Sequence, residues 1–342
     1  MLISLFFIVV VFLLLIIPHE LGHFLVAKAS RMKVEKFSIG FGPKLLGFKR
    51  KETEYQISAF PLGGYVKISG MEPGTRDVED GFYSKPLSKR FAVLFSGSAM
   101  NFFVSMILFS SIFMMGFTTV DLKSPVVGEI IPGSPAEGAG IKPGDKILTV
   151  NGHQIKEWSE MARFIQSSEK EKITLVVLRE EKKVTFEIKP RYYEEYQRKL
   201  IGISPSTKFV RYDPLTSIYM GGERVVFSIV LIFKSLVGMI TGQVPTEFAG
   251  PVGIMQYVGE ATRLGIIPFI SLAALLGVNL GIFNLFPIPA LDGGRILFLL
   301  IEMIRKKPVE IELQEFAHYI GFLILITLML LVTYQDILRL MR

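Results

Sequence analysis

Four long apolar stretches run along this chain, and each predicts a helix that crosses a membrane. A bilayer core needs about 20 residues of helix, and the stretches are long enough to provide it. We expect these helices at residues 1–27, 91–120, 266–294 and 316–336. A fifth apolar run, Val225–Phe233, is too short to cross and has charged residues on both sides. We therefore expect residues 206–265 to form amphipathic helices at the membrane interface.

The composition agrees with a polytopic membrane protein. Half of the residues are hydrophobic, the mean hydropathy is +0.45 and only 20% are charged, whereas a soluble domain has about 25% charged residues. The first stretch also has the length of a secretory signal peptide. It lacks the basic start and the small-x-small cleavage site of one, which favours a permanent helix.

The net charge of +7 predicts an orientation for these helices. Residues 28–91 carry 13 basic and 7 acidic residues, an excess of six positive charges. Basic segments beside membrane helices stay in the cytoplasm. We therefore expect residues 28–90 and 295–315 in the cytoplasm and residues 118–265 outside. The basic excess comes without a groove-reading or base-stacking motif, so we expect no nucleic-acid partner.

Two regions outside the apolar stretches predict β structure. In residues 28–90, glycines separate short β-like runs such as Tyr55–Ser58 and Gly64–Ile68, which predicts a β-hairpin or small sheet at the cytoplasmic face. A flat surface loop is the alternative. Residues 121–205 alternate strand-like runs with turns and one helical segment, as a small α+β domain does. Their motif Gly-Ser-Pro-Ala-Glu-x-Ala-Gly-Ile-x-x-Gly-Asp-x-Ile-x-x-x-Asn-Gly, at 133–152, closely resembles bacterial PDZ domains.

Candidate metal chemistry lies at the end of the first apolar stretch. His19-Glu20-Leu21-Gly22-His23 is an H-E-x-x-H motif, and on a helix residues i and i+4 share one face. Both imidazoles can therefore reach one zinc ion, with Glu20 beside it as general base. The alternative is a set of solvated polar residues at the membrane boundary. The chain has no cysteine, so a third zinc ligand has to be an imidazole or a carboxylate.

Asp292 is the preferred third ligand, ahead of His318. It follows Asn284-Leu-Phe-Pro-Ile-Pro-Ala-Leu, in which two prolines two residues apart unwind the end of the third membrane helix. The alternative for Asp292 is an N-cap of the helix that follows. The ligands meet only if the first and third membrane helices both run inward, which requires that Val225–Phe233 does not cross the membrane.

Together these motifs identify the chain as similar to bacterial site-2 proteases, in the branch related to regulator of sigma-E protease. The motifs are the H-E-x-x-H sequence, the Gly-Phe-Gly run at Gly40–Gly42, one PDZ-like segment, Gly250-Pro251-Val252-Gly253 and the Asn-x-x-Pro-x-Pro-x-Leu-Asp-Gly pattern. The resemblance implies four transmembrane helices, a membrane-associated β-loop on the cytoplasmic side and an extracytoplasmic α+β PDZ domain. The chain departs from the family in two respects. It has room for one PDZ domain where two are common, and it has Gly97-Ser98 where Gly-Pro is usual.

The resemblance also implies a function. The chain would be a zinc-dependent intramembrane endopeptidase of the bacterial inner membrane, cutting single-pass proteins after another protease has trimmed them. Anti-sigma factors and remnant signal peptides are the expected substrates. Catalytically silent binding of protein tails by a membrane PDZ receptor is the alternative. Substrate contacts are expected from Asn284, Pro287, Gly40, Gly42, Tyr65 and Val66, and the PDZ groove, which would hold an extended peptide tail, from Ile201, Gly202 and Ile203.

Overall fold

The computed structural model describes residues 2–71, 78–168, 170–194, 197–243 and 249–341. They divide into two compact units, and residues Gly116–Arg211 form the second of these. In the described residues, four helices are long and apolar enough to cross a membrane, which confirms the predicted number. They are Phe6–Ala29 within α1 (Leu2–Ala29), and the whole of α2 (Leu87–Met115), α7 (Ile266–Asn284) and α9 (Ile311–Leu340).

Helix α2 packs against α1 and α7 in the first unit through small side chains. A Cβ on Gly22 of α1 would lie 2.8 Å from the carbonyl carbon of Ser96 in α2, and Gly281 of α7 lies against the ring of Phe102. Small residues let membrane helices approach closely, so that dispersion contacts hold them together. Ser96, Gly97, Ser98, Asn101 and Ser105 of α2 are all buried in these contacts.

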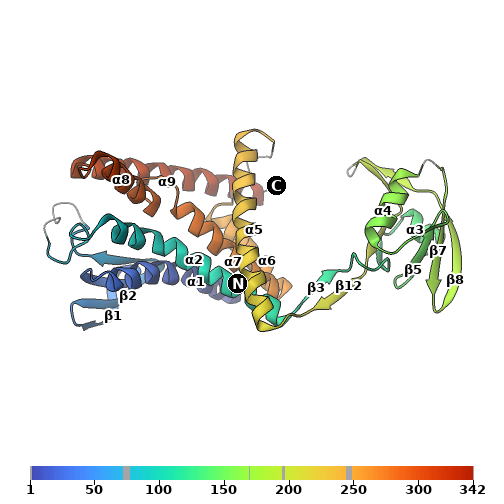
Figure 1. The fold of residues 1–342 in the computed structure, drawn as a ribbon, viewed down its shortest axis with the longest axis horizontal. Helices are drawn as coiled ribbons and strands as arrows, with labels where there is room; N and C mark the ends of the chain where they lie inside the picture. Colours follow the sequence, from blue (N-terminus) through green and yellow to red (C-terminus); the bar gives the residue numbers. More distant parts are fainter. Residues whose placement is uncertain (1, 72–77, 169, 195–196, 244–248, 342) are drawn as a thin grey trace. The chain divides into compact units, whose positions relative to one another are not determined.

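Helix α5 (Pro214–Ile240) is much longer than the apolar run that predicted it. Asp213 accepts hydrogen bonds from the backbone N–H groups of Leu215 and Thr216, both at 3.1 Å, and so caps the helix well before Val225. Figure 1 shows α5 running across the direction of α1 and α2, and its place at the membrane interface stays a prediction. Helix α6 (Pro251–Leu264) follows, and the short helix α8 (Asp292–Arg305) lies between α7 and α9.

The predicted β region consists of two long strands, β1 (Val34–Arg50) and β2 (Thr53–Ile68), which bend to make extra pairings. Ile39 of β1 pairs with both Gly64 and Ile57 of β2, so the first part of β1 lies between two segments of its partner. The bend follows Gly40 and Gly42, whose φ angles of +91° and +87° favour glycine. The outer edge of residues 64–68 pairs with no other strand among those described.

The second unit has the α+β organisation that the sequence predicts. A four-stranded antiparallel sheet has the order β6 (His153–Gln154), β5 (Lys146–Val150), β7 (Ile173–Arg179) and β8 (Lys182–Ile188). Strand β4 (Val127–Ile130) pairs with β11 (Ile203–Pro205), and the helices are α3 (Pro135–Ala139) and α4 (Trp158–Ser167). A ribbon of β3 (Phe117–Val120) and β12 (Thr207–Val210) and a pair of β9 (Arg191–Tyr193) and β10 (Arg198–Leu200) complete the unit.

A partly buried ion pair joins the turn before β5 to the end of β7. The Arg179 guanidinium donates to both carboxylate oxygens of Asp145 at 2.7 Å. Burial alone would raise the pKa of Asp145, but hydrogen bonds from Arg179 and from the backbone N–H of Lys142 hold that pKa below its usual value. The ionised form of Asp145 therefore stabilises this unit.

Candidate metal centre and active site

Three side chains from the first and third predicted membrane segments converge on one point. The Nε2 atoms of His19 and His23 lie 3.2 Å apart, and Asp292 Oδ2 lies 3.2 Å from the first and 3.1 Å from the second. Both histidines are buried. The first turn of α8 carries Asp292, but no side chain caps that helix. The N-cap alternative for Asp292 is therefore wrong, because its carboxylate faces the imidazoles.

These spacings fit a zinc ion. Ligand atoms about 2.0–2.2 Å from one tetrahedral ion lie roughly 3.3–3.6 Å from one another, close to the separations seen here. Two neutral imidazole nitrogens and one carboxylate are a donor set that zinc prefers, and three protein ligands leave a fourth position for water. His19, His23 and Asp292 would therefore hold the ion.

Neighbouring groups fix the orientation of both imidazoles. His23 Nδ1–H donates to the backbone carbonyl of Val93 at 2.7 Å, which leaves the Nε2 lone pair for a metal. His19 Nδ1 lies 3.4 Å from the side-chain amides of Asn101 and of Asn284. The buried Oδ1 of Asn101 lacks a partner among the described residues, and a half-turn of that amide lets Oδ1 accept the Nδ1–H of His19. With its amide turned in this way, Asn101 would orient His19.

Gly97 of α2 forms the floor under the two imidazoles. A Cβ at this position would lie 2.6 Å from His19 Cε1 and would also collide with His23 Nε2. The site therefore needs a residue without a side chain at this point. The sequence carries only an indirect signal for it, in the small residues around Ser98.

The loop between α7 and α8 carries Asp292 to the histidines. Cβ atoms on Gly293 and Gly294 would collide with backbone of this loop, so the two glycines let it fold tightly against the start of α8. His318 of α9 donates from Nδ1 to the carbonyl of Pro289 at 3.0 Å. The weaker prediction that His318 is a metal ligand is wrong, because among the described residues the ligand atoms that cluster belong to His19, His23 and Asp292.

The β region lies against the predicted general base. A Cβ on Gly64 would be 3.1 Å from Glu20 Cγ and 3.4 Å from a methyl carbon of Ile16, so the unpaired edge of β2 passes directly beside Glu20. The predicted substrate residues Tyr65 and Val66 follow on this edge and are half-buried. Gly40 and Gly42 lie at the bend of β1, and Pro287 is exposed in the loop before Asp292.

The predicted PDZ groove residues lie at the start of β11. Ile201 is part of the hydrophobic core of the second unit, while Ile203 is partly exposed. Gly202 has a φ of +83° and its carbonyl accepts the backbone N–H of Ile131 at 2.9 Å. Strand β11 pairs with β4 on one side, and no described strand pairs with its other edge.

Comparisons with known proteins agree with this site. The sequence pattern of peptidase family M50 matches residues 6–328. A Fusobacterium nucleatum protein, FN1322, provisionally named a zinc metalloprotease, is 39% identical over 98% of this chain and 99% of its own length. Zinc metalloprotease RasP of Geobacillus kaustophilus is 31% identical, and regulator of sigma-W protease RasP of Bacillus subtilis is 28% identical. The alignments cover 96% and 97% of this chain, and 96% and 97% of those proteins.

Proposed function

This chain belongs to peptidase family M50, the site-2 proteases, and is a zinc metalloprotease of the membrane; we propose that it hydrolyses peptide bonds within the transmembrane segments of single-pass proteins. The observation that carries this proposal is the convergence of His19, His23 and Asp292 at the ends of membrane helices. Ionisable side chains are costly in membrane segments, so a cluster of them there indicates a functional site.

Different residues of this chain would have different roles in hydrolysis. A bound zinc ion acidifies water and polarises a carbonyl group. Glu20 would take the proton from the attacking water and give it to the leaving amine. Asn284 would hydrogen-bond the substrate backbone near the cut. The free edge at Gly64–Val66 would pair with the substrate as an added strand, because a helical substrate must be unwound before its carbonyls are accessible.

An apolar cavity beside the site supports a helical substrate. It has a volume of about 760 Å³ and is lined by residues of α1, α5, α6 and α7. Its lining includes Ile16, one turn before His19, and Phe283, next to Asn284. We propose that the substrate helix occupies this cavity before it unwinds at the edge of β2.

The second unit would select substrates on the extracytoplasmic side of the bacterial inner membrane. The free edge of β11 suits capture of an extended tail, and a folded unit of this kind would also exclude proteins that still carry bulky outer domains. The name of the Bacillus subtilis relative supports anti-sigma factors as one substrate class. Remnant signal peptides are the other.

Replacing Glu20 tests the proposal. In proteoliposomes with a single-pass reporter, Glu20→Gln should lower the cleavage rate by about 10²–10⁴-fold, while zinc content stays the same. Glu312→Gln, an exposed residue of α9, is the matched control and should cleave at the normal rate. Chelation should abolish cleavage and zinc should restore it. Normal cleavage by Glu20→Gln would show that another base is used, and a protein that only binds tails would cleave nothing in any form.

A further inference from the structure

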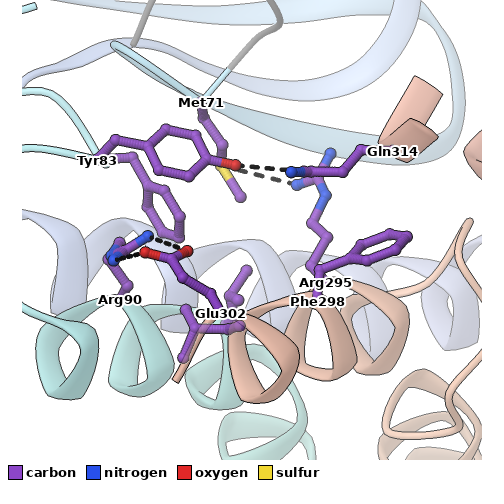
Figure 2. A pocket seen from close by; sticks show the side chains of 10 residues that line it. Met71, Tyr83, Arg90, Arg295, Phe298, Glu302 and Gln314 are labelled. Atoms are coloured by element: carbon purple, nitrogen blue, oxygen red, sulfur yellow. Dashed lines mark hydrogen bonds and ion pairs between the residues drawn. The ribbon is translucent and has the colours of Figure 1, made fainter. Parts of the chain in front are cut away.

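Residues of α2 and α8 line a small polar pocket (Figure 2). Its nearest lining residues lie about one helical turn from the metal centre. On α8, Arg295 follows Asp292 by three residues and lines the pocket. On α2, Leu94 lines it and follows Val93, whose carbonyl orients His23. A helical turn rises about 5.4 Å, so the pocket is within reach of a substrate bound at the zinc ligands. Its volume is about 50 Å³, enough for one small polar group.

The pocket holds a buried ion pair that has one donor left over. Arg90 donates to the two carboxylate oxygens of Glu302 at 2.7 and 3.0 Å, and it stacks over the ring of Tyr83 at 5.3 Å. Figure 2 shows this pair on one side of the pocket. Arg90 is only 6% exposed, and its Nε–H has no acceptor among the described residues. Because this Nε–H is itself buried, a group in the pocket cannot reach it, and Arg90 holds Glu302 in the wall of the pocket.

Arg295 adds a positive charge that makes no ion-pair contact with a described carboxylate, although it is close enough to interact with the charge of Glu20. Its Nη1 lies 3.7 Å from the sulfur of Met71, and no described acidic group lies within ion-pair distance of it. Figure 2 shows its side chain rising from α8 toward Met71 and Gln314. Because Glu302 cancels the charge of Arg90, the described side chains leave the pocket with one net positive charge.

We propose that this pocket binds an acidic side chain of the substrate and so helps to select the cleavage site. The proposal rests on the proposed function. An arginine fork matches the two oxygens of a carboxylate, and the pocket volume suits that group. An extended chain advances about 3.3 Å per residue, so the acidic residue would lie roughly two to four residues from the cut. Helix α8 leads toward the expected cytoplasmic side, which places the acidic residue on that side of the cut.

A set of matched reporters tests this proposal. Single-pass reporters differ only in carrying Asp, Asn or Lys at each of the six positions on the cytoplasmic side of the cut. At one position, the wild-type protein should cleave the Asp reporter with a kcat/KM about 10-fold above that of the Asn reporter. Arg295→Gln should remove this preference, and Arg295→Glu should favour Lys instead. Arg305→Gln, an exposed arginine at the end of α8, should keep the wild-type preference.

Other outcomes separate this proposal from the proposed function. If wild-type protein cleaves every reporter but prefers Asp at no position, the pocket does not read acidic residues. The same holds if Arg295→Gln slows all reporters equally, which indicates a structural role. If wild-type protein cleaves no reporter and matches Glu20→Gln, it is the proposed protease function that fails.

Discussion

Replacing Gly97 with alanine should disable the metal centre without unfolding the protein. The added methyl carbon would lie 2.6 Å from His19 Cε1. An ordinary carbon contact is about 3.4 Å or more, so the ring has to move by about 0.8 Å. A displacement near 1 Å in a catalytic group costs about 10²-fold in rate. We expect a loss of about that size in reporter cleavage, together with weaker zinc binding measured by equilibrium dialysis and elemental analysis.

Gly259→Ala in α6 is the matched control, because nothing lies within 4 Å of a Cβ at that position. It makes the same change in a helix and should leave zinc content and cleavage unchanged. Both variants should have the same helix content by circular dichroism. Full zinc occupancy and a normal cleavage rate in Gly97→Ala would refute the idea that this glycine forms the floor of the site.

Two further predictions concern buried carboxylates. Asp336 of α9 accepts the backbone N–H of Gly253 at 2.7 Å and is 2% exposed, so Asp336→Ala should loosen the start of α6. We expect its free energy of unfolding, measured by thermal unfolding in detergent, to fall by about 1.5–3 kcal/mol. Asp336→Asn should lose less. In the second unit, the pKa of Asp145 is lower in the folded protein than in the unfolded chain. Its contribution to stability is therefore complete above the unfolded pKa and disappears as the pH falls through the folded pKa. Arg179→Gln should shift this loss of stability to higher pH. Trp158, the single tryptophan, reports this unfolding by fluorescence, and identical acid transitions in both proteins would contradict the assignment.

Sequence reasoning predicts the parts of this site that depend on local spacing. The two histidines lie four residues apart on one helix, and the two prolines before Asp292 predict an unwound segment. The ligand set therefore follows from helical geometry and topology. Gly97 and Asn101 were not predicted as site residues. Their importance arises where α2 crosses α1, and such a crossing leaves no periodic signal in either helix.

The same limit applies to the fold. The four apolar stretches predict the membrane helices because bilayer thickness sets their length. Hydropathy also led to an underestimate of α5, since Glu223 and Arg224 interrupt the apolar run but do not interrupt the helix. The double pairing of Ile39 depends on the bend after it, and a strand pattern alone cannot show which of two segments a strand will meet.

The contact of Gly22 with Ser96 restricts which movements can admit a substrate. The backbones of α1 and α2 nearly touch at this contact, and Gly97, the residue after Ser96, packs against both imidazoles. Any sliding of one helix past the other would therefore distort the ligand cluster. We therefore expect the enzyme to open toward lipid by displacement of its peripheral helices, with α1 and α2 held together at this junction.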